Sequence, residues 1–577
     1  MSPERLLQYF ERISEAPDAI PRLRRFILDL AVRGKLVEQN PEDEPAADLI
    51  ERIQDEIERL VRTGESRPPK QIARQGKVAR PFELPFGWEF AHLGSVAVCL
   101  DHRRVPVNNE ERSKRIAGKA EADLYPYYGA TQQQGWIDDY LFDEELILLG
   151  EDGVPFLDPY RPKAYVVSGK CWVNNHAHVF RGILVSNRYL VHSLNVFDYS
   201  GRVAGATRAK LNQSKALNIP IPLPPLVEQH RIVAKVDELM ALCDELEAAQ
   251  AKREDRRARL VAATLHGLNN GDTEPGPDTA LDFSESARFY LNHLPRLTTR
   301  PEHIHQLRKT ILNLAVRGKL VPQDPEDEPA EELVRQIQKE REWALEASKR
   351  SRQVVSWPAN GDELPFEAPS HWAWLRLNDI GIISGGMTPS MNRPDYWDGD
   401  INWFSPKDFT SDELTDSGLK ITEIALKETR LQLYPPGCLF MVARSGILKR
   451  RFPISINRVA AAANQDLKIL KPFINGLERY LQLMFKGMEA FILNALVKTG
   501  TTVQSLKYSE FEVQHFPLPP LAEQHRIVAK VDELMALCDE LETHLTTAAT
   551  TRARLLDGTL HEALNGAGDK AEAAMAD

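Results

Sequence analysis

The sequence predicts an α+β protein with pseudo-two-fold symmetry, in which two globular domains are joined by two long helices that form an antiparallel intramolecular coiled coil. The first observation is a repeat: PLPPLVEQHRIVAKVDELMALCDELE spans 222–247 and recurs at 517–542, with Val227 replaced by Ala522. The second is that the segments between the repeats diverge and are rich in glycine, proline, aromatic residues and short β-type runs. A repeated helical frame therefore carries two different inserts.

The composition is that of a globular protein. The chain has 577 residues, of which 42% are hydrophobic. No apolar run approaches the ~20 residues of a membrane span, and no apolar signal core follows the first residues. The five cysteines are scattered without CxxC spacing, which is typical of a reduced, cytoplasmic chain.

The net charge of -11 argues at first against a nucleic-acid partner, because phosphate binding requires lysine and arginine. The acidic excess lies in the repeated frame, however, whereas the two inserts are close to neutral and contain clusters of basic residues. Charge alone therefore leaves DNA binding open.

The frame begins with a predicted pair of helices. The first starts at Pro21 and ends at Gly34, because its apolar residues recur at i, i+3, i+4, i+7 and i+8. The second starts near Pro45 and also has one apolar face. The same pair is predicted again at about 303–317 and 329–349, where the segments LAVRGKLV and PEDEPA recur.

Each long repeat is predicted to be a helix with an apolar seam. Its seam residues step by 4, 3, 4 and 3, which is the a/d pattern of a coiled coil. They are Ile232, Val236, Leu239, Cys243 and Leu246 in the first repeat, and Ile527, Val531, Leu534, Cys538 and Leu541 in the second. The alternative is an ordinary core face. Two nearly identical seams most simply bury each other, so we expect them to form the coiled coil and the frame for subunit docking.

The two inserts open alike, since PFGWEF at 85–90 matches PSHWAW at 369–374, and we expect a shared fold with different working surfaces. Polar stretches at 62–83 and 351–363 are predicted linkers. The predicted divisions are an N-terminal helical segment (1–80), a first insert domain (81–221), a first long helix (222–268), a linker (269–302), a central helical segment (303–360), a second insert domain (361–516), a second long helix (517–566) and a disordered tail (567–577).

Further motifs lie within the inserts. The first contains YPYYGAT (125–131) and WVNNHAH (172–178), and the second contains GGMTPS (385–390), YWDGDINW (396–403) and NQD (464–466). Together with the duplicated frame, these motifs resemble the specificity subunits of type I restriction-modification enzymes. Two residues depart from the usual pattern: Gln132 stands where glycine commonly follows YYGAT, and Met387 is inserted into what is commonly GGTPS. Both departures fall where target sequence would vary.

The resemblance implies a cytoplasmic bacterial or archaeal protein that acts in host defence and DNA methylation. Its inserts would be target-recognition domains, each reading one half of an asymmetric, interrupted site in double-stranded DNA. Its frame would recruit two modification (methyltransferase) subunits, which use S-adenosylmethionine to methylate adenine N6. Two restriction subunits, which are ATP-dependent translocases and nucleases requiring Mg, would join the larger complex.

The resemblance also implies a non-catalytic chain that binds no cofactor itself. The residues agree, because there is no NPPY or DPPY tetrad, the nearest approach being Asp158-Pro159-Tyr160, and no GxxxxGK[ST] phosphate loop. His176/His178 and His303/His305 are HxH pairs without further ligands at suitable spacing, so no metal site is predicted.

Candidate DNA contacts are amide, hydroxyl and cationic side chains in the inserts. Glutamine and asparagine can hydrogen-bond adenine and arginine can hydrogen-bond guanine, whereas arginine and lysine also contact phosphates. The candidates are Gln132, Gln133, Gln134, Asn174 and Asn175, with Arg103, Arg104, Lys114 and Arg115, in the first insert; in the second they are Asn392, Arg393, Lys407, Thr501, Thr502 and Gln504, with Lys449, Arg450 and Arg451. The alternatives are a solvated turn for QQQG, a hydrogen-bonded strand end for NNHAH and a solvated face for the cations.

Two other classes of protein compete with this interpretation. A coiled-coil protein whose inserts bind protein or carbohydrate would fit the near-neutral inserts, but it does not explain why the inserts differ while the frames are nearly identical. A self-sufficient methyltransferase is disfavoured by the missing motifs. The acidic frame predicts that partner subunits supply much of the phosphate-binding charge.

Overall fold

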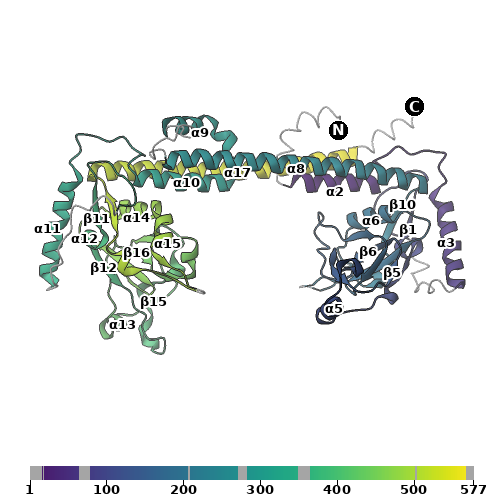
Figure 1. Ribbon diagram of the computed structural model, residues 1–577, viewed down its shortest axis with the longest axis horizontal. Helices are drawn as coiled ribbons and strands as arrows, with labels where there is room; N and C mark the ends of the chain where they lie inside the picture. The colour runs from purple at the N-terminus through teal and green to yellow at the C-terminus, as the bar shows by residue number, and fades with distance from the viewer. Residues whose placement is uncertain are drawn as a thin grey trace. The chain divides into compact units, whose positions relative to one another are not determined.

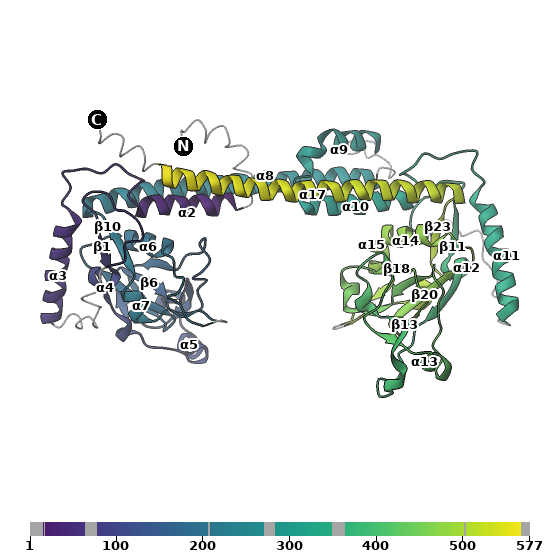
Figure 2. The same ribbon diagram turned by 180° about the vertical axis from the view of Figure 1, so that it is seen from behind.

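The computed structural model describes residues 16, 18–63, 78–205, 208–270, 283–348, 364–500 and 503–566. The chain divides into two compact units, Met1–Glu254 with Ala548–Asp577 as unit 1 and Asp255–Thr547 as unit 2. Each unit joins part of the helical frame to one insert domain (Figures 1 and 2). Among the described helices, none combines the length and the apolar character that spanning a membrane requires. The predicted tail and most of the two predicted polar linkers lie outside the described residues.

Both long helices contribute to both units. Helix α8 (Leu226–Asn270) and helix α17 (Leu521–Gly566) are each continuous over their length. The division between the units falls inside each helix, after Glu254 in α8 and after Thr547 in α17. Unit 1 therefore holds the first part of α8 and the last part of α17, and unit 2 holds the reverse.

Helix α2 (Ala19–Val32) gives the direction of both long helices within unit 1. Along α2 and the turn after it, contacts to α17 run from Arg22 with Asp557 to Lys35 with Leu564, and contacts to α8 run from Arg24 with Asp244 to Gln39 with Glu228. The residue numbers rise in α17 and fall in α8. The two long helices are thus antiparallel, as predicted.

The predicted partner of each seam was wrong. In unit 1, the seam residues of α8 are buried with Ile20, Ile27 and Ala31 of α2. In unit 2, those of α17 are buried with Ile304 and Ile311 of α10 (Pro301–Val316). The antiparallel arrangement leaves the two seams in different units, so a short helix of the same half covers each one. At the end of the first seam, Leu246 is 41% exposed.

The other frame helices are α3 (Ala46–Arg62), α9 (Phe283–Leu297) and α11 (Ala330–Ser348). Helix α9 corrects the sequence interpretation, because it lies in the stretch predicted as a linker (269–302). Its Tyr290 and Leu297 are buried against Val261 and Leu265 of α8, which explains why this segment is ordered.

The insert domain of unit 1, domain 1, contains two four-stranded sheets. One has the order β2-β9-β6-β7 and the other β4-β3-β8-β5, while β1 pairs with β10 where the domain meets the frame. The strands are β1 (Glu89–His92), β2 (Ala97–Cys99), β3 (Tyr125–Tyr128), β4 (Gln133–Ile137), β5 (Phe142–Asp143), β6 (Leu146–Gly150), β7 (Ala164–Val167), β8 (Lys170–Val173), β9 (Ala177–Gly182) and β10 (Pro220–Leu223). The helices are α4 (Leu93–Val96), α5 (Asn109–Ile116), α6 (Asn187–Val196) and α7 (Gln213–Leu217), with short 3-10 turns η1 (Asp101–Arg103) and η2 (Glu121–Asp123).

The insert domain of unit 2, domain 2, contains sheets of order β12-β20-β16-β18-β14, β15-β13-β19 and β17-β22-β21, and the pair β11-β23. The strands are β11 (Ala373–Arg376), β12 (Gly381–Gly385), β13 (Trp397–Phe404), β14 (Glu413–Leu414), β15 (Lys420–Ile421), β16 (Leu439–Val442), β17 (Arg444–Ser445), β18 (Ile454–Asn457), β19 (Ala461–Ala463), β20 (Leu467–Pro472), β21 (Val497–Lys498), β22 (Gln504–Leu506) and β23 (His515–Leu518). The helices are α12 (Leu377–Ile380), α13 (Glu423–Glu428), α14 (Glu478–Gly487), α15 (Glu489–Ala495) and α16 (Tyr508–Phe511), with 3-10 turns η4 (Pro394–Tyr396), η5 (Pro406–Asp408) and η6 (Gly446–Lys449).

The two domains share a topology. The order β2-β9-β6-β7 corresponds to β12-β20-β16-β18. In both domains a second sheet contains one parallel pair, β3 with β8 and β13 with β19. The shared opening sequence, which forms β1 and β11, therefore introduces the same fold twice.

The repeated segments of the frame meet at equivalent contacts in each unit, and we call the contact around Glu228 or Glu523 the joint. In unit 1, the buried carboxylate of Glu228 accepts hydrogen bonds from Nε1 of Trp88 (3.0 Å) and Nε2 of Gln39 (3.2 Å). Burial raises the pKa of Glu228, although these hydrogen bonds oppose the shift. In unit 2, Glu523 accepts from Trp372 and Gln323, each at 2.9 Å.

A helix of each insert domain also fastens to the frame. The hydroxyl of Tyr189 on α6 donates to the carbonyl of Pro222 (2.6 Å), and that of Tyr480 on α14 donates to Pro517 (3.0 Å). Arg188 and Arg479, one residue earlier in each helix, pair with the equivalent aspartates of α8 and α17. These contacts explain why the frame repeats its sequence although the inserts do not.

One position of this contact differs and predicts a pH effect. The pKa of His192 on α6 is lowered to about 4. Burial is the main cause, and the positive charge of Arg188 is the second. The unfolded chain binds a proton near pH 6.5, so stability from the neutral ring is present above that pH and is lost as pH falls towards 4. Leu483 holds the corresponding place on α14, three residues after Tyr480.

We therefore expect His192→Leu to remove an acid-induced loss of roughly 3 kcal/mol in unit 1. The measurement is urea unfolding at pH 7 and pH 4.5, followed by tryptophan fluorescence. Leu483→Ile serves as a control that leaves the pH dependence unchanged. Equal acid sensitivity in the native chain and His192→Leu would contradict the assignment.

Candidate nucleic-acid interface

The structure brings two predicted readers of domain 1 together. Parallel pairing of Tyr128 with Val173 places the turns after β3 and β8 side by side. A Cβ added to Gly129 would lie 2.7 Å from Cγ of Gln134 and 3.3 Å from Nδ2 of Asn174. The QQQ and NN segments, which are far apart in sequence, therefore form one amide-rich surface.

Not all of these amides are equally accessible. Gln132, Gln133 and Gln134 are exposed at the start of β4, an edge strand. Asn175 is exposed as well, whereas Asn174 is 8% exposed and its Oδ1 accepts the backbone N–H of His176 (2.9 Å). Asn174 thus supports the turn, and the three glutamines and Asn175 remain candidate base readers.

Helix α5 lies on the sheet beside these glutamines. Its Arg112 stacks over Tyr127 at 4.7 Å and donates to the carbonyl of Gln134 (3.0 Å). Arg115 stacks over Trp172 at 4.8 Å and pairs with Asp138 (2.6 Å). These contacts hold α5 in place. Figures 1 and 2 show α5 at the end of domain 1 remote from α2.

The predicted phosphate contacts of domain 1 are largely used within the protein. Arg103 pairs with Glu144 (3.1 Å) and stacks over Phe142. Lys114 pairs with Glu110 (2.8 Å), although its side chain is 74% exposed. A paired cation gains less from a phosphate because its existing pair must first break.

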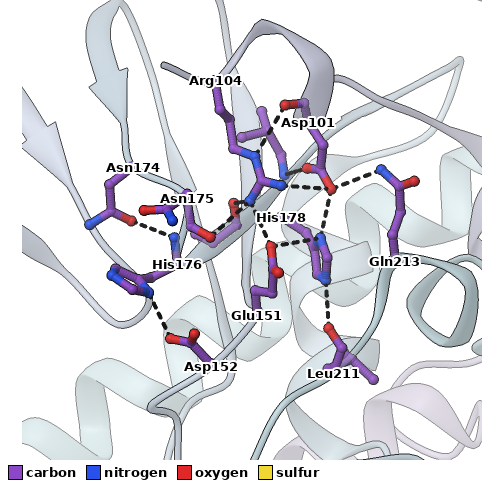
Figure 3. Close-up of polar contacts among 12 residues, drawn as sticks. Asp101, Arg104, Glu151, Asp152, Asn174, Asn175, His176, His178, Leu211 and Gln213 are labelled. Atoms are coloured by element: carbon purple, nitrogen blue, oxygen red, sulfur yellow. Dashed lines mark hydrogen bonds and ion pairs between the residues drawn. The ribbon is translucent and has the colours of Figure 1, made fainter. Parts of the chain in front are cut away.

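Among these cations, Arg104 is the one most fully engaged by internal partners. Its guanidinium is 13% exposed and pairs with Glu151 (2.9 Å) and Asp101 (3.2 Å), inside the network drawn in Figure 3. It also donates to the carbonyl of Ala177 (2.6 Å). Arg104 therefore fixes the loop before β9, and a phosphate could bind Arg104 only if these ion pairs broke. No local pattern reveals these ion pairs, since both acids are recognised as partners only once the chain has folded.

The histidines of NNHAH belong to the same region but have separate partners. Nδ1 of His176 contacts Asp152 (2.8 Å), and His178 contacts Asp101 through Nδ1 (2.7 Å) and the carbonyl of Leu211 through Nε2 (2.8 Å) (Figure 3). Burial raises the pKa of Asp101, but hydrogen bonding to His178 and the charge of Arg104 outweigh it and leave the pKa below its usual value. In the described residues, one cluster of carboxylate and imidazole groups could hold a metal ion, and it consists of Asp101, Glu151 and His178. The guanidinium of Arg104 already pairs with both carboxylates of this cluster.

In domain 2 the three motifs form one structural element. The backbone N–H of Met387 donates to Ala463 (2.7 Å), and Nε1 of Trp403 donates back to the carbonyl of Met387 (3.0 Å). A Cβ on Gly386 would lie 2.1 Å from the carbonyl oxygen of Asn464. The inserted Met387 is thus held at both its N–H and its carbonyl, and its side chain is 39% exposed.

The polar candidates nearby have different environments. Asn392 is exposed, but Arg393 pairs with Asp395 (2.6 Å) and Glu428 (3.0 Å) and stacks over Tyr396. Figures 1 and 2 show the adjoining α13 at the end of domain 2 remote from α10. Arg393 therefore fastens this end of the domain, which leaves Asn392 as the accessible candidate.

Gln504 is likewise held inside domain 2. It is 4% exposed and donates to the carbonyl of Gly500 (2.9 Å), because alternation along β22 turns Gln504 inward and Ser505 outward. Thr501 and Thr502 lie outside the described residues. The basic candidates Lys407, Lys449, Arg450 and Arg451 are all exposed, and Arg451 donates to the carbonyl of Phe409 (3.3 Å).

Comparison with known proteins decides the family. The family model described as "Type I restriction modification DNA specificity domain" matches residues 85–254 and 369–550, which together make up more than half of the chain. The chain belongs to this family. The match recurs once for each insert domain and extends into the long helix that follows it, in agreement with the duplicated fold.

Two curated relatives from Escherichia coli span almost the whole chain. The specificity subunits of the type I restriction enzymes EcoAI and EcoEI are each 28% identical over 95% of this chain and 94% of their own length. A solved chain from a study of complex assembly in a type I restriction-modification system is 16% identical and covers 84% of this chain and 100% of that one, with a TM-score of 0.46. The chain is thus a non-catalytic type I specificity subunit with two DNA target-recognition domains.

Proposed function

We propose that the two target-recognition domains each read one half of an asymmetric, bipartite site in double-stranded DNA. The observation that carries the proposal is that the two domains have the same topology but expose different side chains. Domain 1 presents exposed glutamines beside α5, whereas domain 2 presents Asn392 and Met387 beside α13. Different donor and acceptor patterns at equivalent ends of one fold would select different base sequences.

We further propose that the frame recruits two modification subunits and, in the larger complex, two restriction subunits. A docking surface that is repeated almost unchanged can present itself to two copies of the same partner. S-adenosylmethionine, ATP and Mg would be bound by those partners, and this chain would supply DNA sequence choice. Its phosphate contacts would come from exposed cations such as Lys407, Lys449 and Arg450, which have no carboxylate partner among the described residues.

The test is to express this chain with its modification subunit in a host that lacks adenine methylation and to map N6-methyladenine across the genome. We expect one new motif with two unlike halves and a fixed spacer, which is absent when this chain is omitted. Absence of new methylation by an assembled, soluble complex would overturn the proposal.

Gln133→Ala tests one reader directly. Its side chain is exposed on the edge strand β4, so we expect the variant to relax or abolish one half-site and leave the other unchanged. The expected loss on cognate DNA is about 1–3 kcal/mol. Binding to cognate and random duplexes by the assembled complex gives the measurement, with Asn174→Ala reporting simple loss of turn structure. An equal loss on both duplexes would remove Gln133 from the readers.

A further inference from the structure

The turn after the central strand of domain 2 carries cations on an outward sheet face. Arg444 of β17 and Lys498 of β21 both lie directly opposite Ser505 of β22. Residues opposite one another in antiparallel strands point to the same face, so the two cations flank Ser505 about 10 Å apart. Both are exposed, and neither forms an ion pair within the part of the chain that the structure describes.

Two further cations adjoin this face. The turn η6 packs against β22, and Lys449 and Arg450 stand at its end. Both are exposed and, among the described residues, neither has a carboxylate partner. Arg444, Lys449, Arg450 and Lys498 together form what we call the β22 surface.

The corresponding place in domain 1 has the opposite charge pattern. There Asp152, in the turn after β6, lies opposite Lys210, as Arg444 lies opposite Ser505. The backbone match is close, because Leu211 donates to the residue after β6 and Leu506 to the residue after β16, each at 2.8 Å.

The charges at this place in domain 1 are neutralised by ion pairs within the protein. Asp152 pairs with Arg208 (2.7 Å) and contacts His176 (2.8 Å). The neighbouring Glu151 pairs with Lys210 (3.0 Å) and with Arg104. The same structural element is therefore closed by ion pairs in domain 1 and left cationic in domain 2.

We propose that the β22 surface binds the phosphate backbone of DNA, so that domain 2 supplies more of the salt-dependent binding than domain 1. This inference rests on the proposed function. Four exposed cations beside a polar sheet face match a polyanion, and each neutralised phosphate releases counterions, which makes binding depend on salt. Domain 1 would then contribute mainly through base contacts.

The experiment uses the assembled complex with its modification subunits and a duplex containing the methylated motif. Each phosphate contact adds about 0.9 to the slope of log affinity against log salt, so Arg444→Ala with Lys498→Ala should reduce the slope by about 2. Cognate and random duplexes should lose affinity alike. Arg444→Lys with Lys498→Arg should keep the slope, and the matched double variant of domain 1, Arg208→Ala with Lys210→Ala, should leave the slope unchanged.

Two results would overturn the inference. One is an unchanged slope in the double alanine variant of domain 2, and the other is an equal reduction in the double alanine variant of domain 1. If the double alanine variant of domain 2 loses its modification subunits on gel filtration while its DNA slope is unchanged, the surface binds an acidic protein face and the inference is wrong. Site preference of the native complex is measured in parallel, so failure of the proposed function shows as absence of any preference and is distinguishable from failure at this surface.

Discussion

Gly34→Ala should destabilise unit 1 by roughly 2–5 kcal/mol. This cost is the sum of the strain of a left-handed backbone at an alanine and the steric overlap of its Cβ with neighbouring atoms. Gly34 has φ +66°, and a Cβ there would lie 2.3 Å from Cγ of Pro85 and 3.2 Å from the ring of Trp88. Both neighbours belong to the opening of domain 1. The side chain would therefore push the domain away from the joint.

Gly87→Ala is the matched control within the same joint. Its φ is also positive, at +83°, but no described atom lies within 4 Å of an added Cβ. It should cost only the backbone preference, about 1–2 kcal/mol. The difference between the two variants isolates the overlap at Pro85.

Hydrogen exchange followed by mass spectrometry measures the effect in each unit separately. In Gly34→Ala we expect faster exchange in α2 and β1, with α10 unchanged. Gly318→Ala should produce the reverse pattern, because Gly318 has φ +70° and faces Pro369 at 2.5 Å. Equal exchange in Gly34→Ala and Gly87→Ala would show that Pro85 yields without cost.

The frame could be predicted from the sequence because each of its helices has local signals. Gly34 marks the end of α2 and Pro21 lies in its first turn, two residues after the observed start at Ala19, while apolar periodicity marks its buried face. Periodicity shows which face of a helix is buried, however, and not what covers it. The seams of α8 and α17 were therefore recognised, whereas their partners α2 and α10 were not.

The candidate site was only partly predictable for a related reason. Exposure of Gln132 to Gln134 followed from a polar turn next to glycine. Burial of Gln504 depended on the register of a three-residue strand, which no local pattern reveals. The ion pair of Arg104 with Glu151 joins distant parts of the chain, so it could be recognised only in three dimensions.

The joint itself was also missed, although its residues were in view. Gln39 and Gln323 follow the repeated LAVRGKLV segment at the same distance, and Glu228 and Glu523 lie inside the long repeat. Recurrence alone did not mark the two glutamates as buried, because exposed charges such as Asp244 and Asp539 recur in the same repeat.

Glu523→Ala should have the second large effect, a loss of roughly 3–5 kcal/mol in unit 2. Glu523 is 0% exposed and accepts hydrogen bonds from Trp372, Gln323 and Nε2 of His371, the last at 3.2 Å. Alanine leaves the buried indole N–H of Trp372 without an acceptor, removes the acceptor of Gln323 and His371, and opens a cavity beside Trp372. Glu523→Gln keeps the volume but turns an N–H₂ group towards a donor, so it should cost less.

The two halves offer an internal comparison. Glu228 has two donors, because glycine replaces His371 at the equivalent position, Gly87. Glu228→Ala should therefore cost less than Glu523→Ala and should loosen unit 1 instead of unit 2. Hydrogen exchange in α2 and α10 separates these outcomes. Equal exchange in Glu523→Ala and the native chain would show that the carboxylate does not fasten domain 2.

The functional consequence should follow the unit that is altered. If the joint holds a target-recognition domain in its reading position, Glu523→Ala should weaken selection of one half of the methylated motif and Glu228→Ala selection of the other. The modification subunits and the unaltered domain remain in both variants, so residual methylation should keep one half-site intact. Loss of both half-sites in either variant would mean that the joint stabilises the whole frame and not one reader, and this distinction is visible in a single methylation map for each variant.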